Sequence, residues 1–213
     1  FFIDFYNRWH MKIKICGLTS TKEAEYLNEN NVDFAGMVMF FPKSKRNINE
    51  NKATEIINAL DESIKKVAVT VSPTLEQVKI IENLGFDYIQ IHSKLENNII
   101  ENTNIPILKA FNVKDIDEYK NFKNIDKIKG FVFDAQEPGS GKTFDWNTLK
   151  TFPKSDKLMI LAGGLNPDNV ANAIKVLHPD CVDVSSGVEN KNGIGKSQEK
   201  INMFVTNARK VSR

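Results

Sequence analysis

The chain has 213 residues, of which 41% are hydrophobic and 26% are charged, so it is long enough to bury one ordinary hydrophobic core. Its 29 basic and 27 acidic residues leave a net charge of +2, which argues against a nucleic-acid partner, and no apolar run is long enough for a membrane span. Two cysteines, Cys16 and Cys181, lie far apart in sequence, which favours a reducing cytoplasmic setting over a disulfide.

The first ten residues, FFIDFYNRWH, differ from the rest because they are aromatic and irregular. They lack the basic start, apolar middle and small-residue cleavage site of a secretory signal. We therefore expect residues 1–10 to be an extension outside the fold, and residues 11–213 to form a single domain.

From Met11 onward, short apolar runs rich in Ile and Val alternate with longer segments of helical period. This alternation is typical of parallel strands joined by crossover helices. Eight strands are expected, at residues 12–16, 34–40, 66–71, 88–92, 107–111, 130–134, 158–162 and 181–185. The helices that follow them are expected at residues 21–30, 50–60, 74–84, 95–102, 114–122, 146–152, 167–177 and 198–209.

Several of these helices begin at recognisable signals, as at Ser72-Pro73-Thr74 and at Asn166-Pro167-Asp168. Eight strand–helix units in just over 200 residues predict an α/β protein with a single-domain (βα)8 TIM barrel of minimal length. An open doubly wound sheet is disfavoured, because the stretch Cys16-Gly17-Leu18-Thr19 lacks the glycine fingerprint that follows the first strand of such sheets.

Two residues at predicted strand ends could carry acid–base chemistry, because the loops after the strands converge on one face of a barrel. Cys16 ends the first strand, and its thiolate is a possible base or nucleophile. Asp134 ends the sixth strand and is a possible proton donor. A lone buried cysteine is usually inert and a strand-ending aspartate often caps a turn, so it is their joint placement that favours a catalytic pair.

Glycine-rich turns follow the last two predicted strands, where many barrels bind phosphate through backbone N–H groups. They read Ala162-Gly163-Gly164-Leu165 and Ser185-Ser186-Gly187-Val188; tight turns without a ligand are the alternative. The loop after Asp134 contains Gly139-Ser140-Gly141-Lys142, which we expect to add a third wall or a lid. It is not the phosphate loop of a nucleotide hydrolase, because Gln136 stands where that motif needs glycine.

Two further side chains are candidates for substrate contact. Arg46, in Pro42-Lys43-Ser44-Lys45-Arg46, is either a solvated charge or the partner of a substrate carboxylate. His92 follows the fourth strand and is either a substrate contact or a histidine at the edge of the core. The three histidines are scattered without ligand spacing, so we expect no metal.

Together these motifs resemble the phosphoribosylanthranilate isomerase family of tryptophan biosynthesis, in the family's order over nearly the whole chain after Met11. The resemblance lies in residues 14–19, 42–46, 89–92, 134, 139–146, 161–170 and 183–189. It implies a cofactor-free Amadori rearrangement of N-(5-phosphoribosyl)anthranilate, with Asp134 as the general acid that opens the ribose ring and Cys16 as the general base that takes the C2 proton. It further implies that Arg46 holds the anthranilate carboxylate and that the phosphate is bound by the turns, with Gly141, Gly163, Gly164, Ser185, Ser186 and Gly187.

The chain departs from the family pattern at Thr70 and Ser72, where phenylalanine and asparagine are usual, at Ser93, where glycine is common, and in a shorter loop after Asp134. These changes leave the acid, the base and the arginine in place. Two alternatives stay open: a sugar-phosphate epimerase, although its usual metal ligands are missing, and a non-catalytic barrel that binds a phosphorylated metabolite. We expect a small phosphorylated substrate and a monomer or homodimer.

Overall fold

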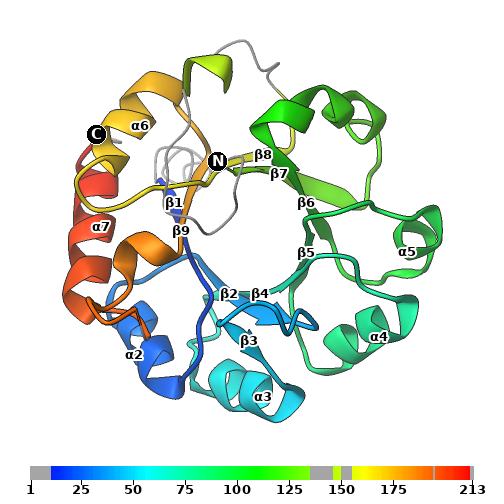
Figure 1. Cartoon of the computed structure of the whole chain (residues 1–213), viewed down its shortest axis with the longest axis horizontal. Coiled ribbons are helices and arrows are strands. Elements are labelled where there is room, and N and C mark those ends of the chain that lie inside the picture. The colour runs from blue at the N-terminus through cyan, green and yellow to red at the C-terminus, as the bar shows by residue number, and fades with distance from the viewer. Residues whose placement is uncertain (1–10, 135–145, 150–154, 194, 212–213) are drawn as a thin grey trace, which may run out of the picture.

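The computed structural model describes residues 11–134, 146–149, 155–193 and 195–211. The expected extension at residues 1–10 therefore lies outside the described residues. Within them, parallel strands form a closed ring and helices cover its outside (Figure 1). The predicted (βα)8 barrel is confirmed.

The barrel strands are β1 (Lys12–Cys16), β2 (Phe34–Met39), β4 (Lys65–Thr70), β5 (Tyr88–Ile91), β6 (Ile107–Asn112), β7 (Ile128–Asp134), β8 (Leu158–Leu161) and β9 (Cys181–Val184). They follow one another around the ring in the order β1, β9, β8, β7, β6, β5, β4, β2. Parallel pairing of β1 with β2, in which Cys16 lies opposite Gly36, closes the ring.

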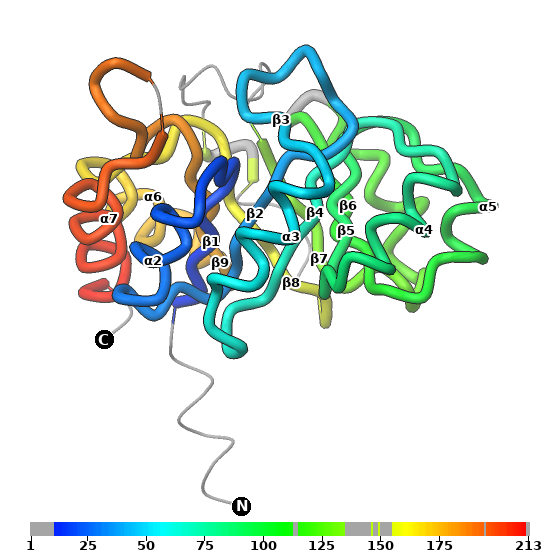
Figure 2. Tube along the Cα trace, turned by 90° about the horizontal axis from the view of Figure 1, so that it is seen from below, coloured from blue at the N-terminus to red at the C-terminus, as the bar shows by residue number. Residues whose placement is uncertain are grey.

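A short strand, β3 (Asn47–Ile48), pairs in parallel with the end of β2 and was not predicted. Two residues are too few to show a sequence period. Seen from the side, the segment with β3 and the segment between β9 and α7 (Gln198–Val211) rise above the same end of the barrel (Figure 2). They are joined there, because Lys45 Nζ donates to the Gly193 carbonyl at 2.9 Å.

The other α-helices are α2 (Thr21–Glu29), α3 (Glu50–Ala59), α4 (Leu75–Asn83), α5 (Asn97–Asn102) and α6 (Val170–Leu177). The predicted start near Thr74 is confirmed, since Thr74 and Gln77 form a capping box. The helix expected from Pro167 begins only at Val170, because the Asn166 side chain accepts from two backbone N–H groups in a preceding turn. None of the described helices has both the length and the apolar character to cross a membrane.

Three of the described segments are 3₁₀-helices, namely η2 (Val113–Asn121), η3 (Trp146–Leu149) and η4 (Ser186–Val188). The α-helix expected at 114–122 is thus wrong in type, in keeping with the low helix propensity of Asp115 and Asp117. The helix expected at 146–152 is described only in its first four residues, as η3.

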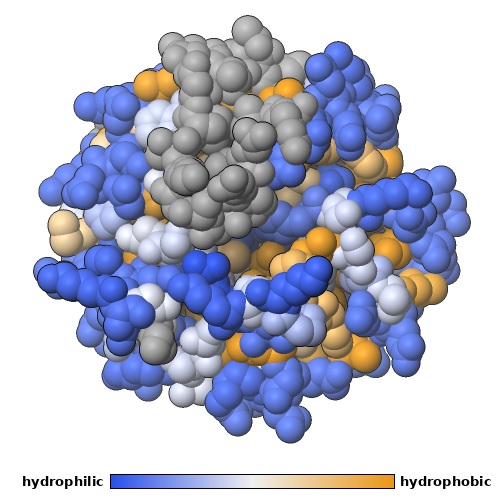
Figure 3. Space-filling model, in the orientation of Figure 1, coloured by the Kyte–Doolittle hydropathy of each residue, from blue (hydrophilic) through white to orange (hydrophobic). Residues whose placement is uncertain are grey.

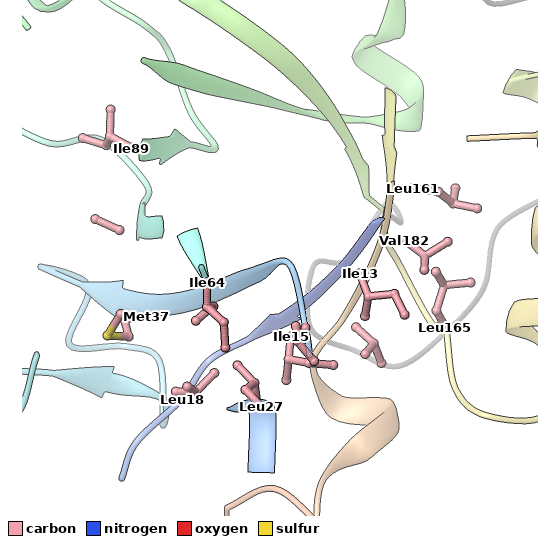
Figure 4. Packing of buried hydrophobic residues seen from close by; sticks show 14 of the residues in the cluster. Ile13, Ile15, Leu18, Leu27, Met37, Ile64, Ile89, Leu161, Leu165 and Val182 are labelled. Atoms are coloured by element: carbon pink, nitrogen blue, oxygen red, sulfur yellow. The ribbon is translucent and has the colours of Figure 1, made fainter. Parts of the chain in front are cut away.

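The hydrophobic core has two layers, because successive side chains of a strand point to opposite faces. Ile13 and Ile15 point outward into the layer between strands and helices, where Figure 4 shows them with Leu27 and Val182. Both isoleucines are fully buried, and each such burial contributes about 1.5–3 kcal/mol. The inner layer is smaller and contains Phe34, Val67, Val69, Leu108, Ala110, Val132, Ile160, Ala162 and Cys181.

Candidate active site

A pocket of about 840 Å³ opens at the carboxyl ends of the strands, a suitable size for a small molecule. In the face seen in Figure 3, hydrophilic residues cover the outer ring and hydrophobic ones show toward the middle. The pocket brings together most of the residues that the sequence singled out, from six loops or strand ends: Cys16, Arg46, His92, Asp134, Gly163, Gly164, Ser185 and Ser186. Gly141, with the rest of the loop at 135–145, lies outside the described residues.

Cys16 lies directly above a buried ion pair inside the barrel. On the same strand face, Lys14 Nζ lies 2.7 Å from Asp183 Oδ2 of β9, and Lys14 is 0% exposed. Burial alone would lower the pKa of Lys14, but Asp183 and Cys16 raise it overall. Burial raises the pKa of the Cys16 thiol, while Lys14 and Lys196 act in the opposite direction. Both thiols, Cys16 and Cys181, are free.

The sequence analysis gave no role to Lys14 or Asp183. A signal was available, because charged residues within apolar strands, two positions before Cys16 and Ser185, must share the inward face with them. Such residues are buried only when they are paired.

Arg46 is held at the pocket mouth by a carboxylate that the sequence analysis also did not single out. Its Nε donates to Glu189 Oε1 at 2.6 Å, and Lys45 Nζ donates to Glu189 Oε2 at 2.8 Å. Burial would raise the pKa of Glu189, but these two cations lower it overall. The Arg46 side chain lies against Gly17, where an added Cβ would come 2.4 Å from Arg46 Cδ and φ is +81°. Only glycine fits this position.

His92 lines the pocket as a neutral ring. Burial, and then the charges of Lys14 and Lys109, lower its pKa to about 4. Gln90 Nε2 lies 2.7 Å from His92 Nε2. His92 can therefore offer hydrogen bonds at neutral pH, but it does not carry the charge of an imidazolium.

The two predicted phosphate turns lie side by side. Gly163 and Gly164 have φ values of +83° and +68°, which favour glycine. Gly187 does not line the pocket; instead it lets η4 pack on the other turn, because a Cβ there would lie 2.0 Å from the Leu165 carbonyl oxygen. The Ser185 hydroxyl donates to the Cys16 carbonyl at 2.9 Å, so its proton is already engaged.

Two of the departures from the family pattern also face the pocket. Thr70 is buried and its hydroxyl donates to the Gln90 carbonyl at 3.0 Å, and Ser93 lines the wall next to His92. Among the residues that the structure describes, no three His, Cys, Asp or Glu side chains are grouped so that they could hold a metal ion.

A closed parallel barrel whose strand ends carry a thiol, a carboxylic acid and paired glycine turns around one pocket defines a (βα)8-barrel enzyme. Comparison with known proteins identifies the particular family. The family model described as N-(5'phosphoribosyl)anthranilate (PRA) isomerase matches residues 13–207. The chain belongs to this family.

Individual relatives agree over nearly the whole chain. The N-(5'-phosphoribosyl)anthranilate isomerase of Thermoanaerobacter sp. (strain X514) is 40% identical over 205 residues, which cover 93% of this chain and 98% of the relative. The crystal structure of phosphoribosyl anthranilate isomerase from Thermotoga maritima is 33% identical, with a TM-score of 0.84 and coverage of 94% and 99%.

A third similar structure is phosphoribosyl anthranilate isomerase in complex with reduced 1-(o-carboxyphenylamino)-1-deoxyribulose 5-phosphate. It has 30% identity, a TM-score of 0.82, and coverage of 94% of this chain and 99% of that one. That relative therefore binds a phosphorylated compound carrying a carboxyphenyl group.

Proposed function

We propose that this chain catalyses the Amadori rearrangement of N-(5-phosphoribosyl)anthranilate to 1-(2-carboxyphenylamino)-1-deoxyribulose 5-phosphate, an aldose–ketose isomerisation. The observation that carries the proposal is the single pocket that both Cys16 and Asp134 line. Strands β9 and β8 lie between β1 and β7 in the ring, so the two side chains approach the pocket from different directions. This arrangement suits a reaction in which one group donates a proton and the other removes one.

In the first step Asp134 donates a proton to the ribose ring oxygen. The bond between C1 and that oxygen breaks, the nitrogen lone pair forms a C=N bond, and the product is an open-chain iminium ion. The side chain comes from the last residue of β7, so a rigid strand presents it to the pocket. Such placement keeps an acid within reach of the bond that it must open.

In the second step the Cys16 thiolate takes the proton from C2. The electron pair of the C–H bond forms a C=C bond to C1 and neutralises the iminium nitrogen, which gives an enolamine. The enolamine becomes the ketone as C1 takes up a proton and the C2 hydroxyl loses one. Because the iminium makes the neighbouring C–H more acidic, a thiolate is basic enough. Each step is driven by a proton transfer that these two side chains can supply, so we propose that neither a cofactor nor a metal takes part.

The remaining pocket residues are proposed to bind the two ends of the substrate. Arg46 suits the anthranilate carboxylate, because its guanidinium nitrogens other than Nε are not needed for the bond to Glu189. The turns at Gly163, Gly164, Ser185 and Ser186 suit the phosphate, with Gly187 joining them. His92 is proposed as a neutral contact; Gly141, a cytoplasmic location, a monomer or homodimer, and the lack of a nucleic-acid partner stay predictions.

The test is to add N-(5-phosphoribosyl)anthranilate to the purified protein in the presence of a chelator and to follow the loss of its anthranilate fluorescence. We expect turnover well above the rate without protein. Fluorescence loss at the protein-free rate would contradict the proposal. The comparisons support the isomerase and not the epimerase, and a non-catalytic barrel would predict that Cys16→Ala changes nothing.

A further inference from the structure

Lys14 is a charged residue in the interior of the barrel, where packing alone would favour an apolar side chain. The inner layer is otherwise built mainly of aliphatic and aromatic side chains, such as Val67, Leu108 and Ile160. A lysine that is 0% exposed loses its hydration, and this loss is made up only by close partners. Lys14 keeps its charge here because Asp183 Oδ2 lies 2.7 Å from its Nζ.

The ammonium group of Lys14 and the sulfur of Cys16 share one small space. Gly36 of β2 lies opposite Cys16, and a Cβ placed on Gly36 would come 3.0 Å from Cys16 Sγ and 3.2 Å from Lys14 Nζ. A side chain at this position would crowd both groups and force them to shift by a few tenths of an ångström. The absence of a side chain at Gly36 therefore lets the cation reach the underside of the sulfur.

We propose that Lys14 is a positioning residue for Cys16, whose buried ammonium, held in place by Asp183, is the counter-ion of the Cys16 sulfur when that sulfur is a thiolate. Lys14 lies behind the sulfur and acts through it. The inference rests on the proposed function only in the sense that it gives the base of that reaction its charge partner. It follows that the sign of the charge beneath Cys16, and not only the packing there, controls how readily the thiolate forms.

Other ionisable groups also face Cys16. From β9, Asp183 opposes thiolate formation, and from the segment before α7, Lys196 favours it. Lys196 Nζ donates to the Ser185 carbonyl at 3.1 Å. Arg46 lies above, against Gly17, while His92 and Asp134 line other parts of the same pocket. Of the cations that act on Cys16, Lys14 has the largest effect.

The experiment measures the rate at which iodoacetamide alkylates Cys16 as a function of pH, in a Cys181→Ala background that leaves Cys16 as the single thiol of the chain. Two variants are compared with this reference: Lys14→Met and the double variant Lys14→Met/Asp183→Asn. We expect the midpoint of the pH profile to rise by about one unit or more in Lys14→Met, which is a tenfold loss of thiolate below the midpoint.

The double variant separates charge from structural damage, because it leaves no unpaired charge in the barrel and should fold even if Lys14→Met does not. Its midpoint should lie between that of the reference and that of Lys14→Met. A loss of packing alone would shift the midpoint of the double variant at least as far as that of Lys14→Met. The proposal is overturned if the midpoint does not rise in Lys14→Met, if the double variant shifts further than Lys14→Met, or if the double variant stays within about 0.3 unit of the reference.

Lys109→Met is the matched control. Lys109 is a second buried lysine, in β6, but its Nζ lies over the ring of Phe111 at 4.7 Å and donates to the Ala110 carbonyl. Its removal should leave the alkylation midpoint of Cys16 unchanged; an equal shift would show that any lost lysine produces the effect and would overturn the proposal. Alkylation needs no substrate, so a failure of the isomerase assay and a failure of this inference are read separately.

Discussion

The pocket has two unlike sides. Below Cys16 the inward positions of β1 and β9 hold the ion pair of Lys14 and Asp183, and Arg46 and Glu189 lie above it. Below Asp134, two positions back along β7, the inward residue is Val132, which belongs to the apolar inner layer. A charged pair therefore lies directly below the thiol, whereas an aliphatic side chain lies two positions below the residue that carries the carboxyl group.

This contrast fits what each group has to do in the proposed reaction. A base that works as an anion is favoured by nearby cations, and a barrel can place them on inward positions of its strands and on the loops above them. The same fold thus places unlike residues beneath the two reacting groups of one pocket. The predictions below test the contrast, from the largest expected effect to the smallest.

The largest effect is expected when either reacting group is removed. Cys16→Ala and Asp134→Ala should each lower kcat by on the order of a hundredfold or more, because a general base or acid is lost. Substrate binding, measured by equilibrium titration, should survive in both. Cys181→Ala is the control, since this buried thiol lies in the inner layer and should leave kcat unchanged. Normal turnover in either of the first two variants would remove the assigned roles.

A smaller effect is expected from Gly187→Ala, which would push the two glycine turns apart. The new Cβ would lie 2.0 Å from the Leu165 carbonyl oxygen, so the free energy of unfolding should fall by about 2–3 kcal/mol and KM should rise. Gly85→Ala is the control, because φ is +85° there with nothing within 4 Å. It should cost about 1–2 kcal/mol in chemical denaturation and leave KM unchanged. Equal KM values for the two variants would contradict the role of Gly187.

His92 on the wall of the pocket should make stability depend on pH. Its pKa is about 4 in the folded chain and about 6.5 when unfolded, so between these values the unfolded chain binds the extra proton. The contribution of neutral His92 to the free energy of unfolding is therefore fully present above pH 6.5 and is lost as the pH falls toward 4. Urea denaturation should show a loss of roughly 2 kcal/mol from this group, after allowance for screening by water in the pocket. His92→Gln should lose less stability over that range, and a parallel loss would refute the assignment.

The smallest effect is expected from Glu189→Gln, which keeps the shape of the side chain that holds Arg46 but removes its charge. KM should rise by about tenfold with kcat nearly constant, because a hydrogen bond to a charged group contributes about 1.5–3 kcal/mol. Lys45→Met removes an exposed partner of the same carboxylate and should change KM by less than about twofold. Steady-state kinetics would contradict the idea if the two variants behaved alike.

The sequence was sufficient for the barrel and for the residues at strand ends. Apolar runs of Ile and Val fix each strand, and the convergence of loops in a parallel barrel then places Cys16, His92 and Asp134 around one pocket. The predictions that failed concern short local elements. Strand β3 has only two residues, and η2 has the composition of a weak helix, so neither leaves a clear periodic signal.

Contacts across long sequence distances were also out of reach. Glu189 accepts a hydrogen bond from Arg46 across 143 sequence positions, and no pattern in either segment predicts that the two residues pair. Lys14 and Asp183 differ, because their inward direction follows from strand alternation once the strands are drawn. The sequence analysis gave them no role, although a charged residue buried in a strand requires a partner of opposite charge.

The hydrogen bond from the Ser185 hydroxyl to the Cys16 carbonyl ties the turn that suits an anion to the strand end that carries the sulfur. A phosphate group bound in that turn would therefore also hold the Cys16 backbone in place, next to the reacting end of the sugar. Binding energy from a part of the substrate that does not react can in this way raise kcat as well as affinity. A dephosphorylated analogue, even at saturating concentration, would then meet a Cys16 side chain that is less firmly aligned, and would rearrange slowly.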